Sequence, residues 1–150
     1  MMFPLSTKFR QNTLLRSFNE LIKFINYTTL KTDEIRQTYF YYIDVSNIHT
    51  VKHRGVYMNY RLKHLDFTNL SVLDGTTAIN GSSVLQYVII RNTENIPSLT
   101  STGSMQGAFK IYVADILYDT YLEHDVWSQL KSRLKKLTEF PADAEANGWD

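Results

Sequence analysis

The sequence contains no cysteine, which excludes disulfide bonds, thiolate metal ligands and a cysteine nucleophile. It has no apolar run approaching the roughly 18 residues that a membrane-spanning helix needs, and its first residues lack the apolar core of a secretory signal. Neither the phosphate-loop pattern G-x-x-x-x-G-K-[ST] nor the nucleophile pattern G-x-S-x-G occurs. These absences favour a chain with no membrane segment, no cofactor and no catalytic signature.

The composition is that of one folded domain. A length of 150 residues is enough to bury a core, and 43% hydrophobic with 21% charged residues is ordinary for a globular protein. Aromatic residues are abundant, with ten Tyr and eight Phe. Tyrosine suits contact surfaces because it combines an apolar ring with a polar tip, although a tyrosine-rich sheet explains the same count.

Charge is distributed unevenly along the chain. Residues 1–64 contain ten Lys and Arg against four Asp and Glu, a charge of +6, so residues 65–150 carry −5. A basic front and an acidic back suit nucleic acid, or head-to-tail contact between identical subunits, or contact between the two halves of one molecule. Residues 1–19 are basic, polar and free of acids, so a mitochondrial location is an alternative to an intracellular, soluble one.

Residues 115–137 have the clearest helical pattern. Their apolar side chains recur at spacings of three and four, acids lie in the first half, and Lys and Arg lie in the second half. Asp115 is a suitable N-cap, and Pro141 cannot continue a helix. The pattern predicts a long helix over 115–137, with a start at Asp125 as the alternative.

The remaining pattern predicts an α+β fold. Residues 11–26 are amphipathic with helical spacing, and residues 38–45, 55–65, 84–91 and 108–113 have the alternation or apolar content of strands. The nearly continuous apolar run at 84–91 predicts a central strand buried on both faces. No internal repeat is evident, so we expect an N-terminal helix, an antiparallel sheet of about four strands and a long C-terminal helix in one domain, 1–137.

An extended tail, residues 138–150, follows the predicted domain. It is polar and acidic apart from two large aromatic side chains, Phe140 and Trp149. These two residues are the expected anchors on a partner protein, and Tyr57 is a third candidate for partner binding.

Two groups of residues suggest metal chemistry. Asp115, Asp119 and Glu123 are spaced by four, so on a helix their carboxylates share one line and could hold a divalent cation. A solvated face whose acids complement the helix N-terminus explains the same spacing. His49 and His53 share one face of an extended segment but lie too far apart for one metal ion.

The segment 49–64 is the best candidate for nucleic-acid binding. It combines basic side chains that pair with phosphates and rings that stack on bases. A basic strand at a sheet edge is the alternative interpretation. The residues concerned are Lys52, Arg54, Tyr57, Arg61 and Lys63.

Three functions therefore follow from the sequence: a non-catalytic structural or assembly subunit that is homo-oligomeric or part of a larger complex, a nucleic-acid-binding protein, or a small metal-assisted enzyme. The order of one early helix, an antiparallel sheet and one late helix resembles small phage tail-completion and neck proteins, which form rings at the head–tail junction. That resemblance implies a virion component, located in the virion or the host cytoplasm. It implies no particular site residue, because element order alone carries it.

Overall fold

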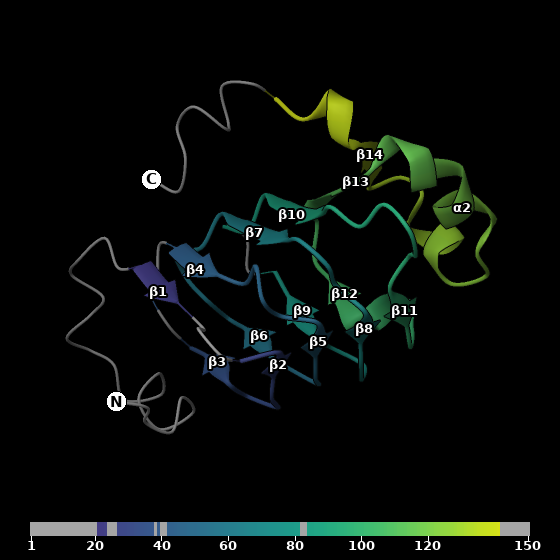
Figure 1. The fold of residues 1–150 in the computed structure, drawn as a ribbon. Coiled ribbons are helices and arrows are strands. Elements are labelled where there is room, and N and C mark those ends of the chain that lie inside the picture. Colours follow the sequence, from purple (N-terminus) through teal and green to yellow (C-terminus); the bar gives the residue numbers. More distant parts are fainter. Residues whose placement is uncertain (1–20, 24–26, 38, 40–41, 82–83, 142–150) are drawn as a thin grey trace.

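The computed structural model describes residues 21–23, 27–37, 39, 42–81 and 84–141. In this part the chain winds into a parallel β-solenoid, in which each coil places one short strand in each of three walls before the next coil begins. Figure 1 shows the coils stacked from β2 and β3 at one end to α2 at the other. Order along the sequence therefore becomes order along the axis of the molecule.

The strands are two to four residues long. Every strand pairing in the described residues is parallel. The first sheet consists of β2 (Thr29–Leu30), β5 (Thr50–Val51), β8 (Val72–Leu73) and β11 (Ser98–Leu99). The second sheet consists of β3 (Ile35–Arg36), β6 (Val56–Tyr57), β9 (Ile79–Asn80) and β12 (Met105–Gln106). The third sheet consists of β7 (His64–Phe67), β10 (Tyr87–Ile90), β13 (Lys110–Val113) and β14 (Leu134–Lys136), while β1 (Leu21–Lys23) pairs with β4 (Tyr42–Asp44).

The core is a set of apolar columns that run along the axis, because strands in register place equivalent side chains above one another. Each column joins one residue per coil, and burying one such side chain stabilises the fold by about 1.5–3 kcal/mol. In the third sheet the sequence offset between register partners is the same from each coil to the next. The three columns are Leu30, Val51, Leu73 and Leu99; Ile35, Val56, Ile79 and Met105; and Leu65, Val88, Ile111 and Leu134.

The corners between the sheets need unusual backbone conformations. Asp33, Arg54 and Gly75 have φ values of 59°, 52° and 88°, and they follow one another at equal sequence intervals at the corner between the first and second sheets. Gln37 and Met58, separated by that same interval, have φ values of 52° and 53° just after the second sheet. The left-handed region thus recurs once per coil at a given corner, which turns the chain sharply after two-residue strands.

The segment after β13 covers one end of the solenoid. It forms a 3-10 helix (Asp115–Leu117), α2 (Tyr118–Glu123) and a second 3-10 helix (Trp127–Leu130) before β14. Tyr121 and Trp127 are fully buried, and the Trp127 indole donates to the Pro97 carbonyl at 2.8 Å. The Arg133 guanidinium donates to the carbonyls of Met105 and Gly107 and so satisfies acceptors beside β12, the last strand of its sheet. None of the helices in these described ranges is long and apolar enough to cross a bilayer.

The predicted long helix over 115–137 is wrong. Its continuous part is six residues long, because the His124 Nδ1 accepts from the backbone N–H groups of Val126 and Trp127 at 3.1 and 3.3 Å. A side chain that bonds nearby backbone in this way competes with the helical hydrogen bonds. Residues 134–136 then pair with β13 as a strand, and 137–139 form another 3-10 helix (Leu137–Glu139).

The predicted antiparallel sheet is also wrong. Short connections suggested hairpins, but each short connection here turns a corner into a different sheet, and the chain returns to the same sheet one coil later. In the predicted helix 11–26, residues 21–23 form β1, while 11–20 and 24–26 lie outside the described residues. The predicted strand over 55–65 ends at Tyr57. The strands within 84–91 and 108–113 are confirmed, and β10 is an interior strand buried on both faces.

Replacing Gly75 tests the corner geometry. Gly75→Ala should lower the free energy of unfolding by about 1–3 kcal/mol, since alanine is strained in the left-handed region and its Cβ would lie 2.7 Å from the His53 Cβ. Urea denaturation followed by circular dichroism measures the change. Thr120→Ala, at an exposed position of α2, is the control and should change stability little. Equal stability of Gly75→Ala and the wild type would contradict this corner.

Two substitutions in the covering segment should have opposite effects. The Tyr121 hydroxyl is buried and makes no hydrogen bond with the described residues, so Tyr121→Phe should raise the free energy of unfolding by about 1 kcal/mol. Trp127→Phe should lower it by at least about 1 kcal/mol, because the Pro97 carbonyl loses its donor and a cavity remains. Thermal unfolding of both variants and the wild type measures these changes. A loss of stability in Tyr121→Phe, or a gain of stability in Trp127→Phe, would contradict this packing.

Candidate functional site

The first coils carry a cluster of arginine and tyrosine side chains on their outer surface, at the second sheet and the corners on either side of it. All its members are half-buried except Tyr60, which is 37% exposed. We call this cluster the arginine–tyrosine surface. It consists of Arg36, Tyr39, Arg54, Tyr57, Tyr60 and Arg61.

Strand register creates the first half of this surface. Arg36 of β3 and Tyr57 of β6 are register partners that alternate with the buried Ile35 and Val56, so both face outwards. The Arg36 and Arg54 guanidinium carbons lie 5.9 and 5.5 Å from the centre of the Tyr57 ring. Two cations are therefore held against one ring.

Asp33 connects the two arginines. The Arg54 Nη2 donates to the Asp33 Oδ2 at 3.0 Å, and the Arg54 Nε lies 2.9 Å from Oδ1. The Arg36 Nη1 lies 3.7 Å from the same carboxylate. Because Asp33 and Arg54 occupy equivalent left-handed corner positions in successive coils, this ion pair staples one coil to the next.

Asn59 orders the second half of the surface. Its buried Oδ1 accepts from the backbone N–H groups of Arg61 and Leu62 at 2.9 and 2.7 Å, which fixes the turn that carries Tyr60. The rings of Tyr39 and Tyr60 have centroids 5.1 Å apart, and the Arg61 guanidinium carbon lies 5.8 Å from the Tyr39 ring centre. The aromatic and cationic groups are thus positioned in advance of any contact with a partner.

The opposite end of the solenoid carries a group of exposed acids, and the basic residues Lys131 and Lys136 of the same covering segment are exposed as well. Asp119 and Glu123 on α2 are exposed, as is Asp125 just beyond it. Asp115 is used within the chain: its carboxylate accepts from the Thr138 N–H at 3.1 Å and from the Thr138 hydroxyl at 2.6 Å. These hydrogen bonds hold the pKa of Asp115 below its ordinary value.

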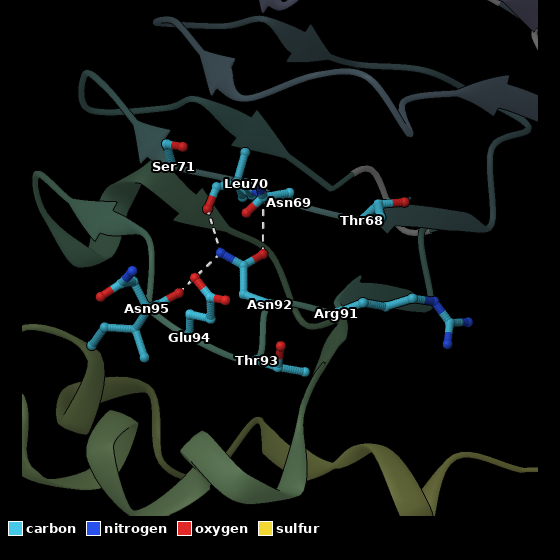
Figure 2. A pocket seen from close by; sticks show the side chains of 10 residues that line it. Thr68, Asn69, Leu70, Ser71, Arg91, Asn92, Thr93, Glu94 and Asn95 are labelled. Atoms are coloured by element: carbon cyan, nitrogen blue, oxygen red, sulfur yellow. Dashed lines mark hydrogen bonds between the residues drawn. The ribbon is translucent and has the colours of Figure 1, made fainter.

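A polar pocket of about 480 Å³ lies between two turns that leave the third sheet. One wall is the turn 68–71 after β7, and the other is the longer turn 91–97 after β10. Figure 2 shows Asn92 in the middle and the Arg91 side chain extending away. The lining residues are Thr68, Asn69, Leu70, Ser71, Arg91, Asn92, Thr93, Glu94, Asn95 and Ile96.

The buried Asn92 fixes the shape of this pocket. Its Oδ1 accepts from the Leu70 N–H at 2.9 Å, and its Nδ2 donates to the carbonyls of Leu70 and Asn95 at 2.6 and 3.0 Å. A single side chain thus satisfies backbone groups of both turns. The Trp127 bond to Pro97 anchors the end of the longer turn, so the pocket is preformed.

The predicted nucleic-acid residues do not form one basic strand. Segment 49–64 contains β5, β6 and the first residue of β7, with corners between them. Lys52 is paired with Asp74 of the next coil at 3.1 Å, which lowers the pKa of Asp74. Arg54, Tyr57 and Arg61 belong to the arginine–tyrosine surface, and Lys63 is a half-buried residue just before β7.

The predicted metal residues are separated by their roles. Asp115 is bonded to Thr138 in a 3-10 helix, whereas Asp119 and Glu123 are exposed on α2. Within the described ranges, no three His, Asp or Glu residues are placed to hold a metal ion. The histidines are apart as well: the His49 Nδ1 lies 2.8 Å from the Asn69 carbonyl, and His64 stacks on Tyr87.

Phe140 packs on its own chain. Its ring lies edge-on to Tyr87 and Tyr112, with centroids 5.2 and 4.9 Å apart, on the outer face of the third sheet. A partner contact by Phe140 stays a prediction, and Trp149 lies outside the described residues. The tail predicted to begin at residue 138 therefore starts with a contact to the domain.

Sequence reasoning missed Asn92, Arg36 and Tyr39. The signal that could have found the last two is the offset between coils, because Arg36 and Tyr39 precede Tyr57 and Tyr60 by one coil and have the same spacing between them. The coil offset does not mark Asn92, because its burial depends on the longer turn after β10.

Glu34, next to Asp33, gives a pH-dependent test of this corner. Burial raises its pKa more than the N–H and charge of Lys31 lower it, and the side chain is only 5% exposed. Since the folded state then binds the proton more tightly, stability falls as pH rises from the ordinary glutamate pKa of about 4.3 through the raised value. Glu34→Gln should therefore stabilise the protein more at pH 7 than at pH 4, as measured by urea denaturation. Glu123→Gln is the exposed control, and an equal effect of Glu34→Gln at both pH values would contradict this assignment.

Comparison of the chain with protein-family models, with curated proteins and with solved structures found no match. The features that bear on function are therefore the two ends of the solenoid and its pocket.

Proposed function

We propose that this chain is a non-catalytic structural subunit that assembles head to tail with copies of itself. The observation that carries the proposal is the placement of two complementary surfaces at opposite ends of the solenoid. The arginine–tyrosine surface lies on the outer side of the first coils, and the exposed carboxylates of Asp119, Glu123 and Asp125 lie on the segment that covers the last coil.

Charge along the axis supports this proposal. The described residues of 21–64 contain seven Lys and Arg against three Asp and Glu, whereas those of 65–141 contain six against eight. Because the solenoid arranges its coils in sequence order, this imbalance becomes a separation between the two ends. Complementary potentials of this kind orient partners and set register.

The chemistry of the arginine–tyrosine surface also favours a protein partner. Arginine and tyrosine are among the side chains most enriched at the energetic centres of protein interfaces, and rigid side chains lose little entropy on binding. Here the Tyr57 ring is held by two guanidinium groups and Arg61 lies against Tyr39. A heterologous contact between two different surfaces produces a ring or a filament.

Nucleic acid is the second candidate partner, since Arg61, Lys63 and the exposed Tyr60 are adjacent. Two of the basic residues in segment 49–64 are in ion pairs, Lys52 with Asp74 and Arg54 with Asp33. The net positive charge of this patch is therefore smaller than its count of Lys and Arg suggests. A virion location stays a prediction. The helix–sheet–helix order on which the phage resemblance rested is absent from the described residues.

Two variants, each blocked at one end, test the head-to-tail contact. Sedimentation velocity of the full chain should show oligomers that dissociate between about 50 and 500 mM salt, because the contact is electrostatic. Arg61→Ala alone, and Asp119→Ala with Glu123→Ala, should each be monomeric, with the contact weakened at least about tenfold. An equimolar mixture of the two should form a dimer and nothing larger, because one intact surface of each kind remains.

Lys110→Glu, an exposed charge change on β13 outside both surfaces, is the control and should assemble as the wild type does. A wild-type monomer at low salt, or a mixture in which the blocked variants stay apart, would contradict head-to-tail assembly. A monomer that binds a labelled oligonucleotide with affinity falling steeply with salt would assign the surface to nucleic acid instead.

A further inference from the structure

The pocket between the turns 68–71 and 91–97 belongs to neither end of the solenoid, and the proposed assembly does not use it. Its volume of about 480 Å³ lies within the range of small-ligand sites. The longer turn has seven residues between β10 and β11, where the turn after β7 has four between β7 and β8. The additional residues form the second wall, so the pocket exists because one corner of the solenoid was lengthened.

The available groups in this pocket are neutral donors and acceptors. The exposed hydroxyl and carboxamide side chains that line the pocket make no hydrogen bond within the described part of the chain. The carboxamide of Asn92 is different, because it holds the two turns together. Hydroxyls and carboxamides both donate and accept, which suits a ligand whose groups also do both. These residues are Thr68, Asn69, Ser71, Thr93 and Asn95.

The charges of the pocket disfavour anionic ligands. Arg91 is bonded to Asp66 by two hydrogen bonds of 2.8 and 2.9 Å, so its cation is compensated. Glu94 is exposed beside Asn92 and Asn95, and its carboxylate repels phosphate and carboxylate groups. The same carboxylate can accept from two neighbouring hydroxyls of one ligand.

Apolar ligands fit no better. Leu70 and Ile96 are the apolar residues of the lining, Leu70 is fully buried, and the other eight lining residues are polar or charged. We propose that this pocket binds an uncharged saccharide, whose ring hydroxyls take hydrogen bonds from the hydroxyls and carboxamides of both turns and donate to Glu94.

Chemical-shift titration of the ¹⁵N-labelled full chain tests this proposal. The probes are the methyl glycosides of glucose, galactose, mannose and N-acetylglucosamine, each added to about 20 mM, which saturates a site with a Kd of about 1 mM. At least one glycoside should shift amides of both turns. Thr93→Ala with Asn95→Ala should raise its Kd at least fivefold, Glu94→Gln should raise it about threefold, and Thr120→Ala should leave it unchanged.

Sodium phosphate and methylammonium chloride are the competing probes. If no glycoside shifts the amides of either turn, the proposal is wrong. It is equally wrong if a glycoside binds the Thr93→Ala, Asn95→Ala variant as well as the wild type, or if phosphate or methylammonium alone shifts these amides. A positive result requires no oligomer, so it is independent of the head-to-tail contact.

Discussion

Parallel stacking of coils is the interaction on which the rest of this structure depends. A strand of two residues buries too little to be stable alone, and its backbone groups find partners only in the coils before and after it. The same register places Leu30, Val51 and Leu73 in one buried column. Backbone pairing and apolar burial are therefore satisfied together or not at all, which makes the solenoid cooperative along its axis.

The surfaces with candidate functions arise where this stacking has to be interrupted. At the corner between the first and second sheets, left-handed residues project Asp33 and Arg54 into an ion pair between coils, and Tyr57 packs beside it. At the corner after β10, a lengthened turn opens the pocket around Asn92. At the last coil, Trp127 and Arg133 satisfy the groups that a further coil would have paired. Core columns keep these features rigid.

The sequence predicted the two longest interior strands but not the architecture. Residues 84–91 are apolar enough to indicate a buried strand, and β10 is one. The coil repeat is not visible as a sequence repeat for two reasons. The number of residues between successive coils changes along the first sheet, and most strands contribute only one inward side chain. Residues 115–137 have a helical period, but the helix ends where the His124 side chain accepts hydrogen bonds from the backbone of Val126 and Trp127. The apolar side chains beyond His124 cover the end of the solenoid. The residue type of Tyr57 predicts a partner contact, whereas its arginine neighbours come together only through coil stacking.

Backbone nuclear Overhauser effects measure the central claim, parallel stacking at a fixed offset in the third sheet, most directly. The solenoid predicts contacts between the strand backbones of Leu65 and Val88, of Val88 and Ile111, and of Ile111 and Leu134, each pair one coil apart. It also predicts that sequential helical contacts stop near His124. Continuous helical contacts from residue 115 to 137, or antiparallel contacts between β10 and β13, would contradict it.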